Sequence, residues 1–326
     1  YPPWYARTAW WYPGKYFKRD YCEPLYLGGL GRGSVKIAVL VSGGVDSSVV
    51  LARLVEQGHE LTAFYLKIWL EDELSFLGDC PWEEDLAFVR AVCEQFAVPL
   101  EVVPMQKEYH ERIVAYTVSQ ARAGCTPSPD VLCNQYIKFG AFFDYLQASG
   151  RVFDKVATGH YAQVVQRGER YHLLMAPDPV KDQTYFLAQL SQTQLAKTLF
   201  PIGDLTKQEV RALAQRYQLP NRDRKDSQGI CFLGKISFNE FLAHYLGTAP
   251  GPIIEEETGT VLGTHQGYWF HTVGQRKGLG LSGGPWYVSR KECQSNTVYV
   301  SRHYYDAGKE RNVFFTLPVH WISGER

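Results

Sequence analysis

The sequence lacks any apolar run long enough to cross a membrane, and it has no internal repeat and no low-complexity linker. Basic and acidic residues are equal in number, 34 of each, so the formal net charge is zero. Overall charge therefore does not predict a nucleic-acid-binding protein, although a local basic patch is compatible with a zero sum. With 326 residues, 45% of them hydrophobic, the composition is that of a globular protein with two or three domains.

The cysteines lack the pairing of a metal or redox motif. Seven cysteines are spread along the chain, and no two of them form a CxxC pair. This spacing argues against a zinc ribbon and against a thioredoxin-like site. A chain of this length does not need disulfides to stabilise its fold, so a reducing compartment is predicted. One or two of the thiols could then be chemically reactive. Cys93 recurs with Leu86, Val89 and Phe96 at helical spacing and is interpreted as a core residue.

The chain does not begin with Met, and residues 1–33 combine many Tyr and Trp residues with five basic and two acidic residues. We interpret this segment as an N-terminal extension, either the remnant of an organelle-targeting leader or a fragment boundary, and it lacks the Ser-rich bias of a typical transit peptide. The expected location is the cytoplasm if the chain is bacterial, and the interior of a mitochondrion or plastid if it is eukaryotic.

Residues 34–225 alternate between strand and helix patterns. Continuous β-branched runs bounded by Gly predict buried parallel strands, and apolar residues at helical spacing predict the helices between them. The strands are expected at 35–41, 60–68, 100–104 and 155–159, and the helices at 46–57, 82–96, 107–122 and 135–147. This order predicts an α/β fold with a doubly wound, Rossmann-like parallel sheet.

The pattern changes after the fourth strand. A hairpin is predicted at 161–176 with Gly168 in its turn, and the capping boxes TKQE (206–209) and SFNE (237–240) each predict the start of a helix. From about residue 250, Gly, aromatic residues and alternating patterns predict β structure. We therefore expect a small α+β, β-rich central domain over 226–290 and the start of a C-terminal β-barrel over 291–326, with the chain truncated inside that barrel.

The stretch SGGVDSS, at residues 42–48, follows the first buried strand. Two glycines let a backbone approach an anion closely, and the N-terminus of the next helix adds a positive dipole end. Asp46 would repel a bare phosphate, so its position predicts a cation between the two, most plausibly Mg²⁺. The stretch is not a Walker loop, because it has neither the GxxxxGK[ST] pattern nor a Lys that could reach the terminal phosphates.

This string resembles the pyrophosphate-binding loop of the ATP-pyrophosphatase superfamily, whose members split ATP between the α- and β-phosphates and adenylate an oxygen of the substrate. The resemblance implies ATP binding by the loop and its flanks. The residues concerned are Val41, Ser42, Gly43, Gly44, Val45, Asp46, Ser47 and Ser48.

Two further motifs contain cysteines: CTPSPDVLCNQYIKFG at 125–140 and KDSQGICFLG at 225–234. Cys133 and Cys231 each follow turn-forming or helix-opening residues with Asp and Lys nearby, and such polar surroundings can lower a thiol pKa. With FYLKIW, ATGHYA, KDQTYFL and HTVGQRKGLG, these motifs make residues 35–300 resemble the tRNA-specific 2-thiouridylase family. The resemblance implies thiolation of the wobble uridine of tRNA at C2.

The resemblance also implies roles for individual residues. Cys231 would carry a persulfide, Cys133 would release its sulfur, and Asp130 would act beside the target base as general base or orienting group. Leu66 and Gly159 would contact adenosine. The tRNA contacts would be Ser128, Pro129, Asp130, His160, Lys181, Asp182, Gln183, Gln275, Arg276 and Lys277, and Arg222, Arg224 and Lys225 form a basic cluster just before Cys231.

The chain departs from the family pattern at Cys125, where the family usually has Arg. This residue adds a third thiol eight positions before Cys133 and could mispair with the other two. Asp130, Cys133 and Cys231 are also a chemically allowed ligand set for an iron–sulfur cluster, which we do not favour. A cysteine desulfurase, directly or through a relay, is the expected sulfur donor, and no membrane partner is expected.

Two other functions stay open at this stage. The chain could be another adenylating synthetase or amidotransferase of the superfamily, which would need no essential thiol. It could also be a truncated, non-catalytic tRNA-binding homologue.

Overall fold

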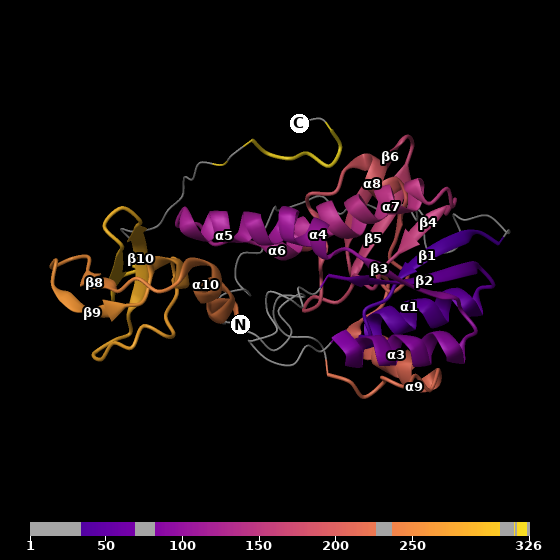
Figure 1. Cartoon of the computed structure of the whole chain (residues 1–326), viewed down its shortest axis with the longest axis horizontal. Helices are drawn as coiled ribbons and strands as arrows, with labels where there is room; N and C mark the ends of the chain where they lie inside the picture. Colours follow the sequence, from indigo (N-terminus) through magenta and orange to yellow (C-terminus); the bar gives the residue numbers. More distant parts are fainter. Residues whose placement is uncertain (1–33, 69–81, 226–236, 307–315, 317, 325–326) are drawn as a thin grey trace, which may run out of the picture.

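The computed structural model describes residues 34–68, 82–225, 237–306, 316 and 318–324. These residues form a larger unit built on a parallel sheet and a smaller unit built on a mixed sheet (Figure 1). No helix in these stretches is long and apolar enough to cross a membrane. The predicted N-terminal extension and the predicted thiol at Cys231 lie outside the described residues.

The larger unit is organised around five parallel strands in the order β3-β2-β1-β4-β7. The chain starts in the middle, moves outward through β2 and β3, and then returns to the other side of β1. Their bounds are β1 Lys36–Leu40, β2 Glu60–Lys67, β3 Leu100–Pro104, β4 Lys155–Ala157 and β7 Thr198–Leu199. Strands are added on one side of β1 first and then, from β4, on its other side. This change creates a switch point between β1 and β4, where ligands of open α/β sheets bind. The predicted doubly wound fold is confirmed.

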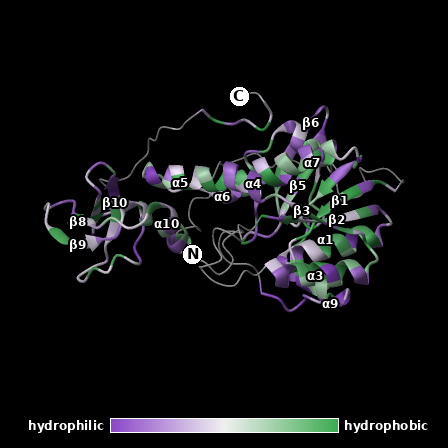
Figure 2. Ribbon diagram, viewed as in Figure 1, coloured by the Kyte–Doolittle hydropathy of each residue, from purple (hydrophilic) through white to green (hydrophobic). Residues whose placement is uncertain are grey.

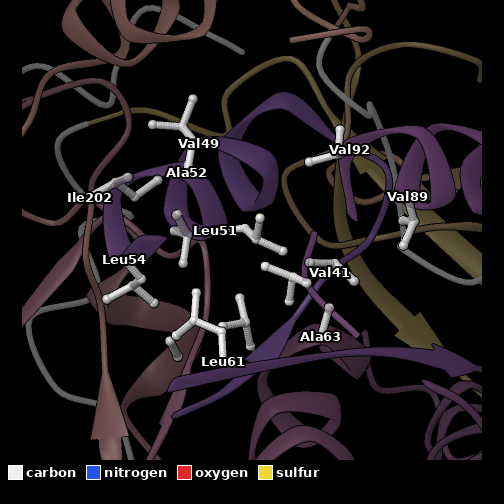
Figure 3. Close-up of a cluster of buried hydrophobic side chains, with 14 of the residues drawn as sticks. Val41, Val49, Leu51, Ala52, Leu54, Leu61, Ala63, Val89, Val92 and Ile202 are labelled. Carbon is white, nitrogen blue, oxygen red and sulfur yellow. The ribbon is translucent and has the colours of Figure 1, made fainter. Parts of the chain in front are cut away.

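Helices cover both faces of this sheet (Figure 1). One face packs against α1 Val45–Glu56, α3 Trp82–Gln95 and α9 Lys207–Arg216, and Figure 3 shows the side chains that fill this layer. The central strands carry mainly hydrophobic residues (Figure 2), as expected for strands buried on both faces. Cys93 lies in this core, 4% exposed, which confirms its interpretation as a packing residue.

The opposite face packs against the helical segment that ends in α7 Phe142–Ala148, against α8 Gln192–Ala196, and against the hairpin of β5 Ala162–Arg167 and β6 Arg170–Met175. The hairpin was predicted, and Gly168 has the positive φ of 61° that its turn needs.

Two predicted helices contain π-helical stretches. The first runs through α4 Gln106–Tyr109, the π-helical His110–Val114 and α5 Ala115–Arg122. The second runs through α6 Pro129–Leu132 and the π-helical Cys133–Ala141 into α7. Periodicity predicted continuous α-helix in both places. Such bulges are frequent at functional sites.

The smaller unit holds a four-stranded sheet in the order β10-β11-β8-β9, with β8 and β11 parallel and the other pairs antiparallel. Its elements are α10 Phe238–Leu246, β8 Gly251–Glu255, β9 Val261–His265, the 3₁₀ turn Tyr268–Phe270, β10 Tyr287–Glu292 and β11 Thr297–Ser301. The domain limit expected between residues 290 and 291 falls inside β10.

Both predicted capping boxes are present. The side chains of Thr206 and Ser237 accept bonds from the N3 backbone of α9 and α10, and Glu209 and Glu240 bond back to the N-cap backbone. The remaining short helices are the 3₁₀ turn Thr184–Leu187 and α8, whose capping box starts at Ser191. The capping box at Thr206 therefore fixes the start of α9 at Lys207.

Candidate nucleotide and thiol site

Residues 42–48, which we call the phosphate loop, lie between the end of β1 and the first turn of α1. Gly43 has a φ of 76°, and a Cβ there would come within 2.6 Å of the Asp85 carbonyl oxygen. Gly44 has an ordinary φ of −76° and leads into α1 without any side-chain cap. The first N–H groups of α1 therefore depend on water or a ligand, which makes this helix end suited to an anion.

The serines of the phosphate loop brace it from within. The hydroxyl groups of Ser47 and Ser48 donate to the Gly44 carbonyl at 3.0 and 3.1 Å, and the Ser42 backbone N–H donates to Ser47 Oγ at 3.2 Å. Ser47 and Ser48 are buried, whereas Ser42 is exposed. The structure thus brings together the predicted residues Val41 to Ser48, with Ser42 at the surface of the loop.

Gly159, just after β4, packs against the start of α1. A Cβ at this position would lie 3.0 Å from the Ser47 backbone nitrogen and 3.1 Å from the Asp46 carbonyl carbon. The ends of β1 and β4 therefore meet at the switch point of the sheet, and only a residue without a side chain allows this close approach.

Asp46 has a protein cation beside it. Its Oδ1 accepts a hydrogen bond from the Tyr161 hydroxyl at 2.9 Å and forms an ion pair with Lys207 Nζ at 2.6 Å. The Lys207 side chain is 16% exposed. A lysine therefore lies at the phosphate loop. The loop sequence contains no such lysine, because Lys207 is 161 residues away from Asp46 in the chain.

The donor set at Asp46 does not build a resident metal site. No group of three or more His, Cys, Asp and Glu residues that could hold a metal ion occurs in the described part of the chain. Asp46 fits a single carboxylate ligand to a cation that arrives already bound to phosphates, as Mg²⁺ does with nucleotides.

Asn221 and Arg224 hold the phosphate loop from the far side. The Asn221 amide donates to the Gly43 carbonyl at 2.8 Å and to Ser48 Oγ at 2.9 Å. Arg224 donates to the same carbonyl at 3.1 Å and forms an ion pair with Asp85 at 2.5 Å. Burial raises the pKa of Asp85, and the Arg224 guanidinium opposes that rise. The predicted basic cluster at 222–225 is thus partly engaged in the protein's own structure.

Cys133 lies at the start of the second π-helical stretch and is 3% exposed. Its hydrophobic neighbours include Ile113, Ile137 and Phe241. Asp130 and Ser128 are half-buried on the preceding turn, and Pro129 is buried at the N1 position of α6. Leu66, at the end of β2, packs against this cluster and against the sheet core.

His160 follows Gly159 and is held in place by the protein. Its Nδ1 lies 2.7 Å from Thr158 Oγ1, and its ring packs against Phe139 and Phe200. Burial, assisted by the positive charge of Lys138, holds the pKa of His160 well below its usual value. The ring is therefore neutral at physiological pH.

The predicted tRNA-contact residues at 181–183 also make internal bonds. The Asp182 carboxylate accepts bonds from the Ala176 backbone and the Thr184 hydroxyl, and the Gln183 amide oxygen accepts from the Tyr161 backbone at 3.0 Å. Gln183 thus positions the tyrosine that binds Asp46. Lys181 is half-buried.

Residues 272–278, the basic loop, belong to the smaller unit. The Gln275 side chain closes this loop by accepting from the Thr272 backbone and donating to the Lys277 carbonyl, both at 2.9 Å. Arg276 and Lys277 are exposed, and Arg276 lines a cavity of about 410 Å³ with Trp286. The two charges therefore face solvent, as a phosphate-contacting loop requires.

Comparison with known proteins gives the family. Residues 35–235 match the family model described as the tRNA methyl transferase HUP domain, and residues 239–302 match that of the tRNA methyl transferase PRC-barrel domain. A tRNA-specific 2-thiouridylase MnmA of Parabacteroides distasonis is 52% identical over 83% of this chain and 74% of its own length. Its counterpart in Porphyromonas gingivalis is 54% identical over 82% of this chain and 73% of its own.

Among solved structures, a 4-thiouridine synthetase in complex with RNA and ATP is 16% identical over 62% of this chain and 46% of its own, with a TM-score of 0.35. That likeness is too low to support a functional conclusion. The two family models and the level of identity to the curated relatives are sufficient: the chain belongs to the MnmA family of tRNA-specific 2-thiouridylases.

Proposed function

We propose that this protein uses ATP to replace the C2 oxygen of the tRNA wobble uridine with sulfur. The observation that carries the proposal is the phosphate loop at the sheet's switch point, in a chain that is 52% identical, over 83% of its length, to a protein named tRNA-specific 2-thiouridylase. The switch point supports the proposed nucleotide site, and the names of the relatives support tRNA as the substrate.

The phosphate loop is suited to hold the triphosphate of ATP. Backbone N–H groups after Gly43 and Gly44 meet the phosphates, while Ser42 contributes an exposed hydroxyl. Lys207 is placed to exchange its Asp46 partner for a phosphate oxygen, which frees Asp46 to approach a Mg²⁺ ion carried by ATP. Leu66 and Gly159 lie at the ends of β2 and β4, where they would border the adenosine.

In the first step the uridine C2 oxygen attacks the α-phosphorus of ATP, and pyrophosphate leaves. The bond that forms makes the oxygen part of an AMP leaving group. Charge moves onto the departing pyrophosphate, and the Lys207 ammonium and the helix end are placed to stabilise it.

In the second step the terminal sulfur of a Cys231 persulfide attacks C2, and AMP departs with the former C2 oxygen. The Cys133 thiolate then attacks the Cys231 sulfur, which leaves 2-thiouridine on the tRNA and a Cys133–Cys231 disulfide. An external thiol must reduce that disulfide before the next turnover. The hydrophobic side chains packed beside Cys133 would help to exclude water from the activated base at this stage. The sulfur donor that reloads Cys231 is proposed to be a cysteine desulfurase or a relay from one.

The test is mass spectrometry of the wobble uridine after incubation of tRNA with the protein, Mg-ATP and a sulfide source. Wild type should give the mass gain of sulfur for oxygen, and Cys231→Ser and Cys133→Ser should not. Cys93→Ser is the matched control, because Cys93 is a buried core thiol on another layer and should keep the activity.

Other outcomes would point elsewhere. If Cys231→Ser and Cys133→Ser thiolate tRNA as wild type does, the thiol mechanism is wrong. If wild type binds tRNA but releases neither AMP nor pyrophosphate, the protein is a binding homologue and not an enzyme.

A further inference from the structure

A second pair of cysteines lies where the two units meet, away from the phosphate loop. Cys125 follows the C-terminal end of α5, and Cys293 follows β10 in the smaller unit. Neither residue is needed by the proposed sulfur transfer. Cys125 is exposed and Cys293 is half-buried.

The turn after α5 presents Cys125 to the smaller unit. Helix α5 ends with the Gly124 N–H bonded to the Ala121 carbonyl and the Cys125 N–H bonded to the Gln120 carbonyl, and Gly124 has a φ of 80°. These bonds fix the direction of the chain at Cys125.

The Cys293 sulfur reaches this same turn. A Cβ built on Gly124 would collide with Cys293 Sγ, so the sulfur lies against the backbone of the residue next to Cys125. Consecutive Cα atoms are about 3.8 Å apart, so the Cys293 sulfur lies within one residue's length of Cys125, and a disulfide forms once the two cysteine Cα atoms approach within about 7 Å. The contact is specific to glycine at 124, because any side chain would fill the place of the sulfur.

Other contacts hold the two units together at this point. The Tyr268 hydroxyl donates to the Arg122 carbonyl and is also within hydrogen-bonding range of Cys293. The hydroxyl groups of Thr126 and Thr272 lie 3.1 Å apart. The smaller unit therefore contacts the chain on both sides of Cys125, at Arg122 and at Thr126.

A lysine faces both sulfur atoms. Lys291 donates to the His271 carbonyl at 2.8 Å within the smaller unit. Burial lowers the pKa of Lys291, and the negative charge of Cys293 and Cys125 thiolates opposes this. An ammonium beside two thiols can stabilise both the attacking and the leaving sulfur during thiol–disulfide exchange.

Cys125 is also accessible to a small reagent. It lines a cavity of about 220 Å³ together with Pro127 and Trp269, between the turn and the smaller unit. An oxidant can enter there and meet the exposed thiol first.

We propose that Cys125 and Cys293 are a redox-active thiol pair, which a small disulfide such as oxidised glutathione converts into a disulfide linking the two units. The Cys125 thiolate attacks one glutathione sulfur, breaks the glutathione S–S bond and releases one glutathione thiolate. Cys293 then attacks the Cys125 sulfur and releases the second. The two cysteines lose two electrons and two protons, and both are taken up as two molecules of reduced glutathione are formed.

The test is peptide mapping of the full chain under non-reducing conditions after treatment with oxidised glutathione. In wild type the peptides containing Cys125 and Cys293 should be joined, with little glutathione left on Cys125. In Cys293→Ser a glutathione adduct should accumulate on Cys125, because the second step has no nucleophile. In Cys125→Ser neither the adduct nor the cross-link should form.

Matched controls keep the test independent of folding and of the proposed function. Cys93→Ser should leave the cross-link unchanged, and Lys291→Gln should slow it several-fold without preventing it. The proposal is overturned if Cys125 is joined to Cys133 or Cys231 instead, or if wild type retains as much glutathione on Cys125 as Cys293→Ser does. Thiolation activity plays no part in this readout, so failure of either proposal leaves the other standing.

Discussion

The phosphate loop at 42–48 and the basic loop at 272–278 are both short, glycine-containing turns that we assign to phosphate groups, yet they are built differently. The phosphate loop is braced by Lys207, Asn221 and Arg224, which come from distant parts of the chain. The basic loop is closed by its own Gln275, and its charges point outward. The first loop therefore depends on exact backbone shape, whereas the second offers charge to a large polyanion.

This contrast predicts opposite sensitivities to mutation. Changes that alter the shape of the phosphate loop should abolish function, while single changes in the basic loop should only weaken binding.

Gly43→Ala should be the most damaging single change. A side chain at a φ of 76° is strained by about 1–3 kcal/mol, and its Cβ would press on the Asp85 backbone. We expect ATP affinity, measured by isothermal titration calorimetry, to fall by roughly 10- to 100-fold. Gly44→Ala is the matched control: its φ is −76° and the nearest atom to an added Cβ, Ser42 Oγ, is 3.5 Å away. Equal losses in both variants would contradict the account.

Lys207→Gln should reduce the rate of the ATP-dependent step by roughly 100-fold, the size expected when one charge-stabilising group is removed. Pyrophosphate release in the presence of tRNA is the measurement. Lys197→Gln, at an exposed position, should retain the wild-type rate. Melting temperatures of both variants would show whether the loss reflects chemistry, and an unchanged rate in Lys207→Gln would remove this residue from the site.

The smaller unit should lose stability in acid because of His271. Burial lowers the pKa of His271 from 6.5 to about 4, helped by the charges of His265 and Lys291. Between pH 6.5 and pH 4 the unfolded state binds a proton that the folded state does not, so unfolding becomes more favourable as pH falls.

The upper limit on this effect is about 3 kcal/mol. Denaturant titrations across this pH range should show a shallower loss of stability in His271→Gln than in wild type. His265 titrates in the same direction and is present in both proteins. Equal pH slopes would show that His271 is not the group responsible.

Arg276→Ala and Lys277→Ala should have the smallest effects. Each should weaken tRNA binding modestly and lower the slope of log affinity against log salt by about one. ATP binding without tRNA should be unchanged. A filter-binding salt titration measures this, and a wild-type slope in the double variant would exclude the basic loop from the tRNA contact.

Local sequence patterns predicted most of the fold and the phosphate loop. Strand β1, the loop and α1 are consecutive in the chain, and the capping boxes at Thr206 and Ser237 are complete within four residues, so short-range rules suffice. The pattern TKQE correctly started α9, but it could not show that Lys207 reaches Asp46.

The side-chain contacts that hold the phosphate loop act over long chain separations. Asn221 and Arg224 meet Gly43 across 178 and 181 residues, and no local pattern encodes such a pairing. The polar surroundings expected for Cys133 were inferred from the Asp and Lys residues near it in the sequence. In the folded protein Phe241 of α10 packs over the cluster that holds Cys133, which only tertiary structure reveals.

In the proposed reaction the wobble uridine oxygen is adenylated and leaves with AMP. The most direct measurement uses tRNA with ¹⁸O at C2 of that uridine, followed by mass spectrometry of the products. The account predicts that AMP carries the ¹⁸O and that one labelled AMP is formed for each 2-thiouridine. Unlabelled AMP, or ADP in its place, would contradict it.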